Sequence, residues 1–180
     1  MKKAIFGGSF DPPHLGHLEI IRQALLTLDI DELLVVPTFL NPFKSKSFAP
    51  ATLRLKWLKD ITNEFTNVKI DSFEIDKNRP VSSIETVQYV QETYKPDEIF
   101  LIIGADNLEN LSKWKEFELL DKKVTWVVAT RDGLNIPDKF IKLNVKKEIS
   151  ASELRDELQE EFITKNTLKD IEAFYHKQGK

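Results

Sequence analysis

The 180-residue chain contains no cysteine. A disulfide framework, a thiolate nucleophile and a cysteine-ligated metal are therefore excluded. Long apolar runs are also missing, since no stretch approaches the roughly 20 residues that span a bilayer. The amino terminus lacks the charged, apolar and small-residue pattern of a signal peptide. We expect a cytoplasmic protein with no membrane partner.

Excess positive charge is lacking as well. The 26 Lys and Arg residues face 29 Asp and Glu residues, which gives a net charge of −3. A protein that wraps nucleic acid is normally clearly basic, so we expect no nucleic-acid partner, although a local basic patch is compatible with this charge. The length, with no repeat or linker in the sequence, predicts one domain over residues 1–180. The oligomeric state does not follow from these features.

The apolar pattern predicts alternating strands and helices. Continuous apolar runs predict buried strands over residues 4–6, 33–37, 98–104 and 124–129, and a shorter one over 141–145. Alternating residues predict edge strands over 68–70 and 72–75. Helical spacing predicts helices over 18–28, 51–65, 114–120 and 167–175. Two further helices should begin at Ser82, where Glu85 completes a capping box, and at Ser150 or Ser152.

This alternation predicts an α/β fold. We expect a doubly wound, Rossmann-like, mostly parallel sheet with helices on both faces and a small helical segment over about residues 150–180. Ligands bind beyond the carboxyl ends of the strands in such sheets. Glycine or polar turns follow the strands that end at Phe6, Ile103 and Ala129, so these turns should share one rim. The long loop over residues 38–50 is a candidate lid.

The chemistry-bearing stretch is GGSFDPPHLGH, residues 7–17. A strand that stops at a double glycine and leads into a helix aims backbone N–H groups at an anion. His14 and His17, spaced i, i+3, lie on one side of the helix start and could bind phosphate oxygens. Alternatively, the two histidines have no binding role and simply cap the helix or face solvent. A zinc pair is disfavoured, because a third Cys or His ligand is missing nearby and i, i+4 is the commoner spacing.

The stretch resembles the His-x-Gly-His signature of the nucleotidyltransferase superfamily. Three more segments resemble bacterial nicotinate-mononucleotide adenylyltransferases: residues 103–108 followed by Trp114, residues 149–155, and residues 79–86. The resemblance runs from Phe6 to about Leu158. It implies that the chain transfers the adenylyl group of ATP to nicotinate mononucleotide, giving deamido-NAD and pyrophosphate in NAD biosynthesis. Residues 162–175 depart from the family's usual carboxyl-terminal pattern.

The resemblance also implies a role for each matching residue. The residues that act on the ATP phosphates in the reaction are His14, His17, Lys44 and Arg155, with Lys46 as an alternative to Lys44. The residues that bind ATP are Gly8, Ser9, Phe10, Gly104, Asp106, Ser150 and Ser152. The residues that bind the mononucleotide are Thr86, Trp114 and Arg131. No protein metal site is implied, because Mg²⁺ is held mainly by the ATP phosphates.

Each assignment has a structural alternative. Ser152 and Arg155 could simply belong to a helix start, Trp114 to the core, and Asp106 to a helix cap. The rival acceptors are nicotinamide mononucleotide and pantetheine phosphate. The family acting on the latter usually has Thr at the position of His14 and lacks the Trp114 segment. A non-catalytic nucleotide-binding regulator is the rival from another class.

Overall fold

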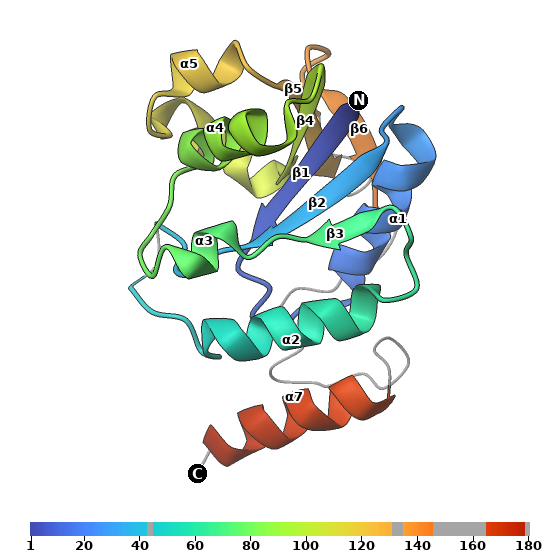
Figure 1. Cartoon of the computed structure of the whole chain (residues 1–180), viewed down its shortest axis with the longest axis vertical. Coiled ribbons are helices and arrows are strands. Elements are labelled where there is room, and N and C mark those ends of the chain that lie inside the picture. The colour runs from blue at the N-terminus through green and yellow to red at the C-terminus, as the bar shows by residue number, and fades with distance from the viewer. Residues whose placement is uncertain (43–44, 131–134, 146–164, 179–180) are drawn as a thin grey trace.

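A six-stranded sheet forms the centre of the molecule (Figure 1). The computed structural model describes residues 1–42, 45–130, 135–145 and 165–178. The strands are β1 (Lys2–Gly8), β2 (Glu32–Pro37), β3 (Val68–Ile70), β4 (Glu98–Gly104), β5 (Thr125–Thr130) and β6 (Ile141–Asn144). Their order is β3-β2-β1-β4-β5-β6, and every neighbouring pair is parallel. The order reverses at β1, so the prediction of a doubly wound, Rossmann-like sheet is confirmed.

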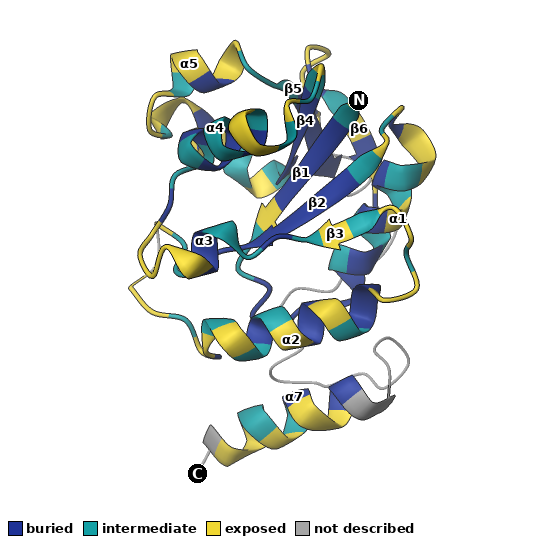
Figure 2. Ribbon diagram, in the orientation of Figure 1, coloured by how far each residue is buried: buried dark blue, intermediate teal, exposed yellow. Residues whose placement is uncertain are grey.

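Helices cover both faces of the sheet. They are α1 (Leu15–Thr27), α2 (Ala51–Thr62), α3 (Phe73–Asp76), α4 (Ser83–Tyr94), the 3-10 helix η1 (Ala105–Lys113), α5 (Phe117–Asp121) and α7 (Lys165–Gln178). In β1, Ala4 and Phe6 join the apolar cluster under α1, α2 and α7, whereas Ile5 joins the cluster under α4 and α5. Because both faces are buried, the strand reads as a continuous apolar run (Figure 2).

Most predicted elements are confirmed, including the capping box of Ser82 and Glu85 at the start of α4. No helix among the described residues has the length and apolarity that crossing a membrane requires. The helix predicted from Ser150 or Ser152 lies outside the described residues.

The strand predicted over residues 72–75 is wrong, because this segment forms α3. Asp71 ends β3 by accepting a hydrogen bond at Oδ1 from the Phe73 N–H group, at 2.9 Å. The Phe73 ring stacks on Tyr89, with centroids 3.9 Å apart. These two contacts turn the chain away from the sheet edge, so that the alternation of Phe73 and Ile75 is not that of a strand.

The helix predicted over residues 114–120 is also displaced. Residues 105–113 form η1, and α5 begins at Phe117 after Glu116, which has a positive φ of 53°. Trp114 therefore lies in the turn between the two helices. Only the part of the predicted helix from Phe117 onwards is helical.

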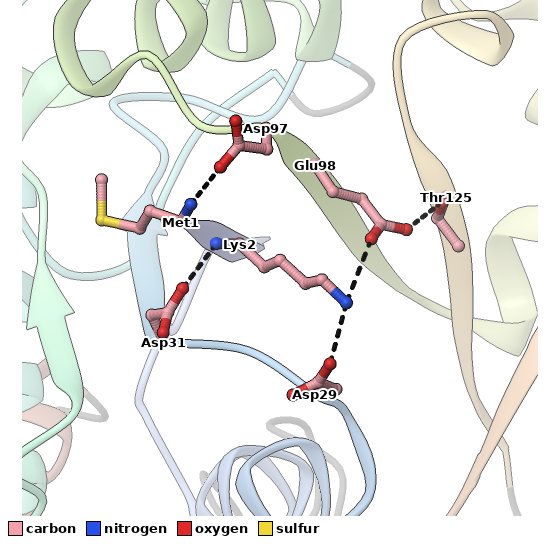
Figure 3. A network of polar contacts seen from close by, with 7 residues as sticks. All are labelled: Met1, Lys2, Asp29, Asp31, Asp97, Glu98 and Thr125. Carbon is pink, nitrogen blue, oxygen red and sulfur yellow. Dashed lines mark hydrogen bonds and ion pairs between the residues drawn. The ribbon is translucent and has the colours of Figure 1, made fainter.

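The amino ends of the central strands carry a network of ion pairs and hydrogen bonds (Figure 3). Its members are Met1, Lys2, Asp29, Asp31, Asp97, Glu98 and Thr125. The Lys2 ammonium lies 2.8 Å from Asp29 and 3.7 Å from Glu98, while the Lys2 N–H group donates to Asp31 at 2.6 Å. Exposed pairs of this kind stabilise a fold only slightly. They connect the loops before β2 and β4 to the start of β1. The opposite edge, at the carboxyl ends of the strands, is where a ligand can bind.

A buried carboxyl group lies in α3. Glu74 is 5% exposed, its Oε1 is 2.6 Å from the Thr86 hydroxyl, and its Oε2 has no hydrogen-bond partner within the described part of the chain. Burial raises the pKa of Glu74 from 4.5 to about 7; the Thr86 hydrogen bond opposes this rise and the charge of Glu85 adds to it. Near neutral pH the folded state therefore holds a proton that the unfolded state has released.

Replacing Glu74 with Gln should remove part of the pH dependence of stability. In the wild type the folded pKa lies above the unfolded one, so the stabilisation from this group is complete below about pH 4.5 and is lost as pH rises towards 7. The loss amounts to at most about 3 kcal/mol. Urea unfolding at pH 5 and pH 8 should show a smaller difference for Glu74→Gln than for the wild type.

The control for this experiment is Glu92→Gln, which neutralises an exposed carboxylate on α4. This control should keep the wild-type difference between the two pH values. An unchanged difference in Glu74→Gln would contradict the raised pKa.

Candidate active site

The carboxyl ends of four strands meet at one edge of the sheet. Gly8 of β1 pairs with Pro37 of β2, and Gly104 of β4 pairs with Ala129 of β5. β1 and β4 are themselves parallel neighbours. The strand ends predicted to share one rim therefore do so, and the turns after β1 and β4 follow them there, whereas the turn after β5 lies largely outside the described residues.

The turn after β1 is built around the buried ring of Phe10. This residue has a positive φ of 47°, and its ring packs edge-on against Phe6 with centroids 5.4 Å apart. A Cβ atom at Gly8 would lie 3.1 Å from the Phe10 ring. Glycine at this position thus lets the ring turn inward. Sequence reasoning assigned Phe10 a backbone role, and the structure adds that its side chain anchors the turn.

His14 and His17 lie together at the start of α1. The His14 N–H group donates to His17 Nδ1 at 3.1 Å, and the His17 N–H group donates to the His14 carbonyl at 2.9 Å. Their rings stack with centroids 3.6 Å apart. The predicted juxtaposition is confirmed, and the capping alternative is realised in the same geometry, while phosphate binding by the two rings stays a prediction.

The surroundings of His17 favour its neutral form. The pKa of His17 is held well below its ordinary value, first by burial and then by the charge of His14. The Phe10 ring lies against it, with centroids 4.7 Å apart. Because Nδ1 accepts the His14 N–H group, the proton of the neutral ring belongs on Nε2, where it can be donated to an anion.

This arrangement suits a phosphate better than a metal ion. The first N–H groups of α1 and the positive end of its dipole lie beside the two rings and favour negative charge. Among the residues that the structure describes, no three His, Cys, Asp or Glu side chains are grouped closely enough to hold a metal.

At the end of β4, Gly104 gives space to a neighbouring side chain. A Cβ atom there would lie 2.3 Å from Asp106 Oδ1, so glycine allows this carboxylate to fold back over the strand end. Asn107 Nδ2 donates to the Gly104 carbonyl at 3.2 Å and supports the same turn. Asp106 is exposed at the edge, where its oxygens can accept hydrogen bonds from a ligand. The predicted contact of Gly104 and Asp106 with ATP stays a prediction.

Trp114 and Thr86 both contact protein groups. The half-buried Trp114 ring packs edge-on against Trp126, with centroids 6.2 Å apart. The hydroxyl of Thr86 is engaged with Glu74. Both residues lie on the α4 face of the sheet, and their contacts with a mononucleotide stay predictions. Five more predicted residues lie outside the described residues: Lys44, Arg131, Ser150, Ser152 and Arg155.

Sequence reasoning missed a fully buried arginine beneath the turn. From α2, Arg54 donates to three backbone carbonyls: Nε to Ala49 at 3.1 Å, one terminal nitrogen to Ser9 at 2.5 Å, and the other to Phe39 at 2.9 Å. Burial lowers the pKa of Arg54, while the charges of Asp11 and Tyr175 oppose this. A guanidinium stays protonated in proteins nonetheless.

A signal for Arg54 was present in the sequence. Arg54 shares the i, i+3, i+4, i+7 spacing of Trp57, Leu58 and Ile61, the apolar face of α2. A cation on an apolar stripe implies a buried partner, since an unpaired buried charge is costly.

Asp11 is the second missed residue. Its carboxylate accepts the N–H groups of Phe48 at 2.7 Å and Ala49 at 2.9 Å, and the Tyr175 hydroxyl at 2.6 Å. We call Asp11, Arg54 and Tyr175 the turn-support cluster. It joins the turn after β1 to the loop before α2 and to α7. Asp11 lies within the stretch of residues 7–17 that the sequence singled out, but nothing local in that stretch reveals these distant partners.

Comparisons with known proteins place the chain in a family. Residues 5–157 match the cytidylyltransferase-like family model. A relative from Sulfurimonas denitrificans, named probable nicotinate-nucleotide adenylyltransferase, is 47% identical over 97% of this chain and 95% of its own length. A relative of the same name from Campylobacter fetus is 46% identical over 99% of both chains.

Solved structures share the fold. The Plasmodium falciparum nicotinic acid mononucleotide adenylyltransferase complexed with NaAD superposes with a TM-score of 0.75 at 22% identity, over 97% of this chain and 96% of that one. A putative nicotinate-nucleotide adenylyltransferase from Vibrio parahaemolyticus gives a TM-score of 0.73 at 21% identity, over 94% and 97%. With full-length relatives above 40% identity, this chain belongs to the cytidylyltransferase-like family, together with the bacterial nicotinate-nucleotide adenylyltransferases.

Proposed function

We propose that the chain transfers the adenylyl group of ATP to nicotinate mononucleotide and so makes deamido-NAD and pyrophosphate. The observation that carries this proposal is the stacked pair of His14 and His17 at the start of α1, directly after the carboxyl end of β1. The names of the full-length relatives supply the acceptor.

In the proposed reaction, a phosphate oxygen of the mononucleotide attacks the α-phosphorus of ATP. The new bond joins that oxygen to phosphorus while the bond to the leaving pyrophosphate breaks. Such a transfer needs positioning and charge stabilisation more than side-chain chemistry. His17 donates from Nε2 to a phosphate oxygen, and the approach of the anion raises the pKa of its ring. His14 binds the same phosphates from the adjacent position.

We assign the remaining charge to residues that the resemblance implies. Lys44 and Arg155 bind the phosphates of ATP, with Ser150 and Ser152 beside them. Mg²⁺, held mainly through the ATP phosphates, would supply further charge neutralisation.

The nucleosides lie further along the same edge in this proposal. Gly8, Ser9 and Phe10 present backbone groups to the nucleotides, and Asp106 accepts the ribose hydroxyls of ATP at the end of β4. Trp114 and Thr86 line the nicotinate end, and Arg131 pairs with the phosphate of the mononucleotide. Both substrates are soluble nucleotides, so we place the reaction in the cytoplasm.

The first test is pyrophosphate release. Purified protein with ATP, Mg²⁺ and nicotinate mononucleotide should release pyrophosphate in proportion to the acceptor added. Nicotinamide mononucleotide and pantetheine phosphate, assayed in parallel, should be poorer acceptors by kcat/KM. Absence of release at high enzyme concentration would refute the proposal, and a better rate with either rival would replace the acceptor.

The second test is His17→Ala. Loss of one preorganised donor to the reacting phosphates should lower kcat about 100-fold to 1,000-fold. The circular dichroism spectrum should be retained, because the buried ring of Phe10 anchors the turn and the loss of one capping hydrogen bond at the start of α1 is small against the packing of that helix. His176→Ala, at an exposed position on α7, is the matched control and should keep wild-type activity. Turnover by His17→Ala near the wild-type value would remove His17 from the mechanism.

A further inference from the structure

A hydrogen bond joins the two ends of the described chain beneath the candidate site. The Tyr175 hydroxyl of α7 donates to Asp11 Oδ1 at 2.6 Å across 164 residues of sequence. α7 lies alongside α2 in the structure (Figure 1). The Tyr175 ring packs near Trp57 of α2, with centroids 6.2 Å apart. The packing of the Tyr175 ring against α2 therefore places its hydroxyl beside Asp11.

Asp11 connects Tyr175 to the candidate site through further hydrogen bonds. The same carboxylate holds the N–H groups of Phe48 and Ala49, so it connects the turn after β1 to the loop before α2. Arg54 holds the Ser9 carbonyl of that turn from the other side. Two side chains therefore restrain the segment from Ser9 to Asp11. Arg54 of α2 binds the Ser9 carbonyl, and Tyr175 of α7 binds the Asp11 carboxylate.

We propose that Tyr175 is a positioning residue for ATP, acting through Asp11. Its hydroxyl holds the Asp11 carboxylate, and that carboxylate keeps residues 9–11 in the shape in which their backbone receives the nucleotide phosphates. A hydrogen bond to a carboxylate is among the stronger kinds in proteins. This inference rests on the proposed function only in that ATP is a substrate.

The competing explanation is that the hydroxyl merely fastens α7 to the body. The structure separates the two roles, because α7 has other anchors. Leu168 and Ile171 are buried in the apolar cluster on this face. The exposed pair of Lys56 on α2 and Asp170 on α7 joins the same two helices without touching the turn-support cluster. Asp170 therefore offers a matched control that weakens the docking of α7 alone.

The test compares Tyr175→Phe with Asp170→Asn. Tyr175→Phe keeps the ring and deletes the hydroxyl. It should weaken the binding of a non-hydrolysable ATP analogue about tenfold by calorimetry, a change equal to about 1.4 kcal/mol. The KM for ATP should rise by a similar factor while the KM for nicotinate mononucleotide changes less than twofold. Asp170→Asn should leave all three values unchanged.

A double variant tests the route through Asp11. If the hydroxyl acts on that carboxylate, Tyr175→Phe should add less than twofold to the loss of analogue affinity already caused by Asp11→Ala, which removes the acceptor altogether. A further tenfold loss in this background would overturn the route.

Three other results would overturn the positioning role. They are wild-type analogue affinity in Tyr175→Phe, an equal loss in Asp170→Asn, and an equal rise in both KM values together with a fall in Tm. The analogue measurement does not depend on the acceptor, so it stays decisive even if nicotinate mononucleotide gives no pyrophosphate. Failure of the proposed function and failure of this inference are therefore distinguishable.

Discussion

The guanidinium of Arg54 is the interaction on which the candidate site depends. It is withdrawn from water, and a buried charge is costly unless hydrogen bonds replace those to solvent. Here the replacement comes from the carbonyls of Ser9, in the turn after β1, and of Phe39 and Ala49, near the two ends of the loop before α2. Because the donors of a guanidinium form a rigid planar fork, satisfying them fixes the turn and both ends of the loop relative to one another. A lysine at this position would offer one point of attachment in place of the fork.

The remainder of the site is arranged on this support. Phe10 turns inward over Gly8 and contacts the ring of His17, so the conformation of the turn also sets the environment of the histidine. Withdrawal of that ring from water favours its neutral form, which leaves one N–H group directed by the hydrogen bond at Nδ1. The packing of Phe10 therefore both restrains the backbone of the turn and favours the neutral form of His17. At the next strand end, Gly104 and Asp106 show the same device, a glycine that admits its neighbour's side chain.

The sequence was informative wherever a pattern repeats locally. Continuous apolar runs identified β1, β2, β4 and β5, because strands buried on both faces need apolar residues throughout. The prediction failed at α3, where Phe73 and Ile75 alternate as in a strand but Asp71 ends the strand first. Contacts between side chains that are far apart in the sequence leave no periodic pattern from which they could be predicted. The family could be predicted because several of its motifs occur together in this sequence. The raised pKa of Glu74 could not be predicted, because it depends on burial that only the assembled fold creates.

The contact of Tyr175 with Asp11 has a consequence for the order in which the molecule is completed. The turn after β1 leaves the ribosome early, and β2, one neighbour of β1 in the sheet, is synthesised well before β4, the other. The N–H groups of Phe48 and Ala49 become available to the Asp11 carboxylate soon afterwards, but the Tyr175 hydroxyl reaches it only after α7 has emerged and docked on α2. Contacts between segments so distant in sequence form late, since the intervening chain must be closed into a loop first. A nascent chain therefore contains the turn after β1 long before it contains Tyr175, which is 164 residues away from Asp11 in the sequence.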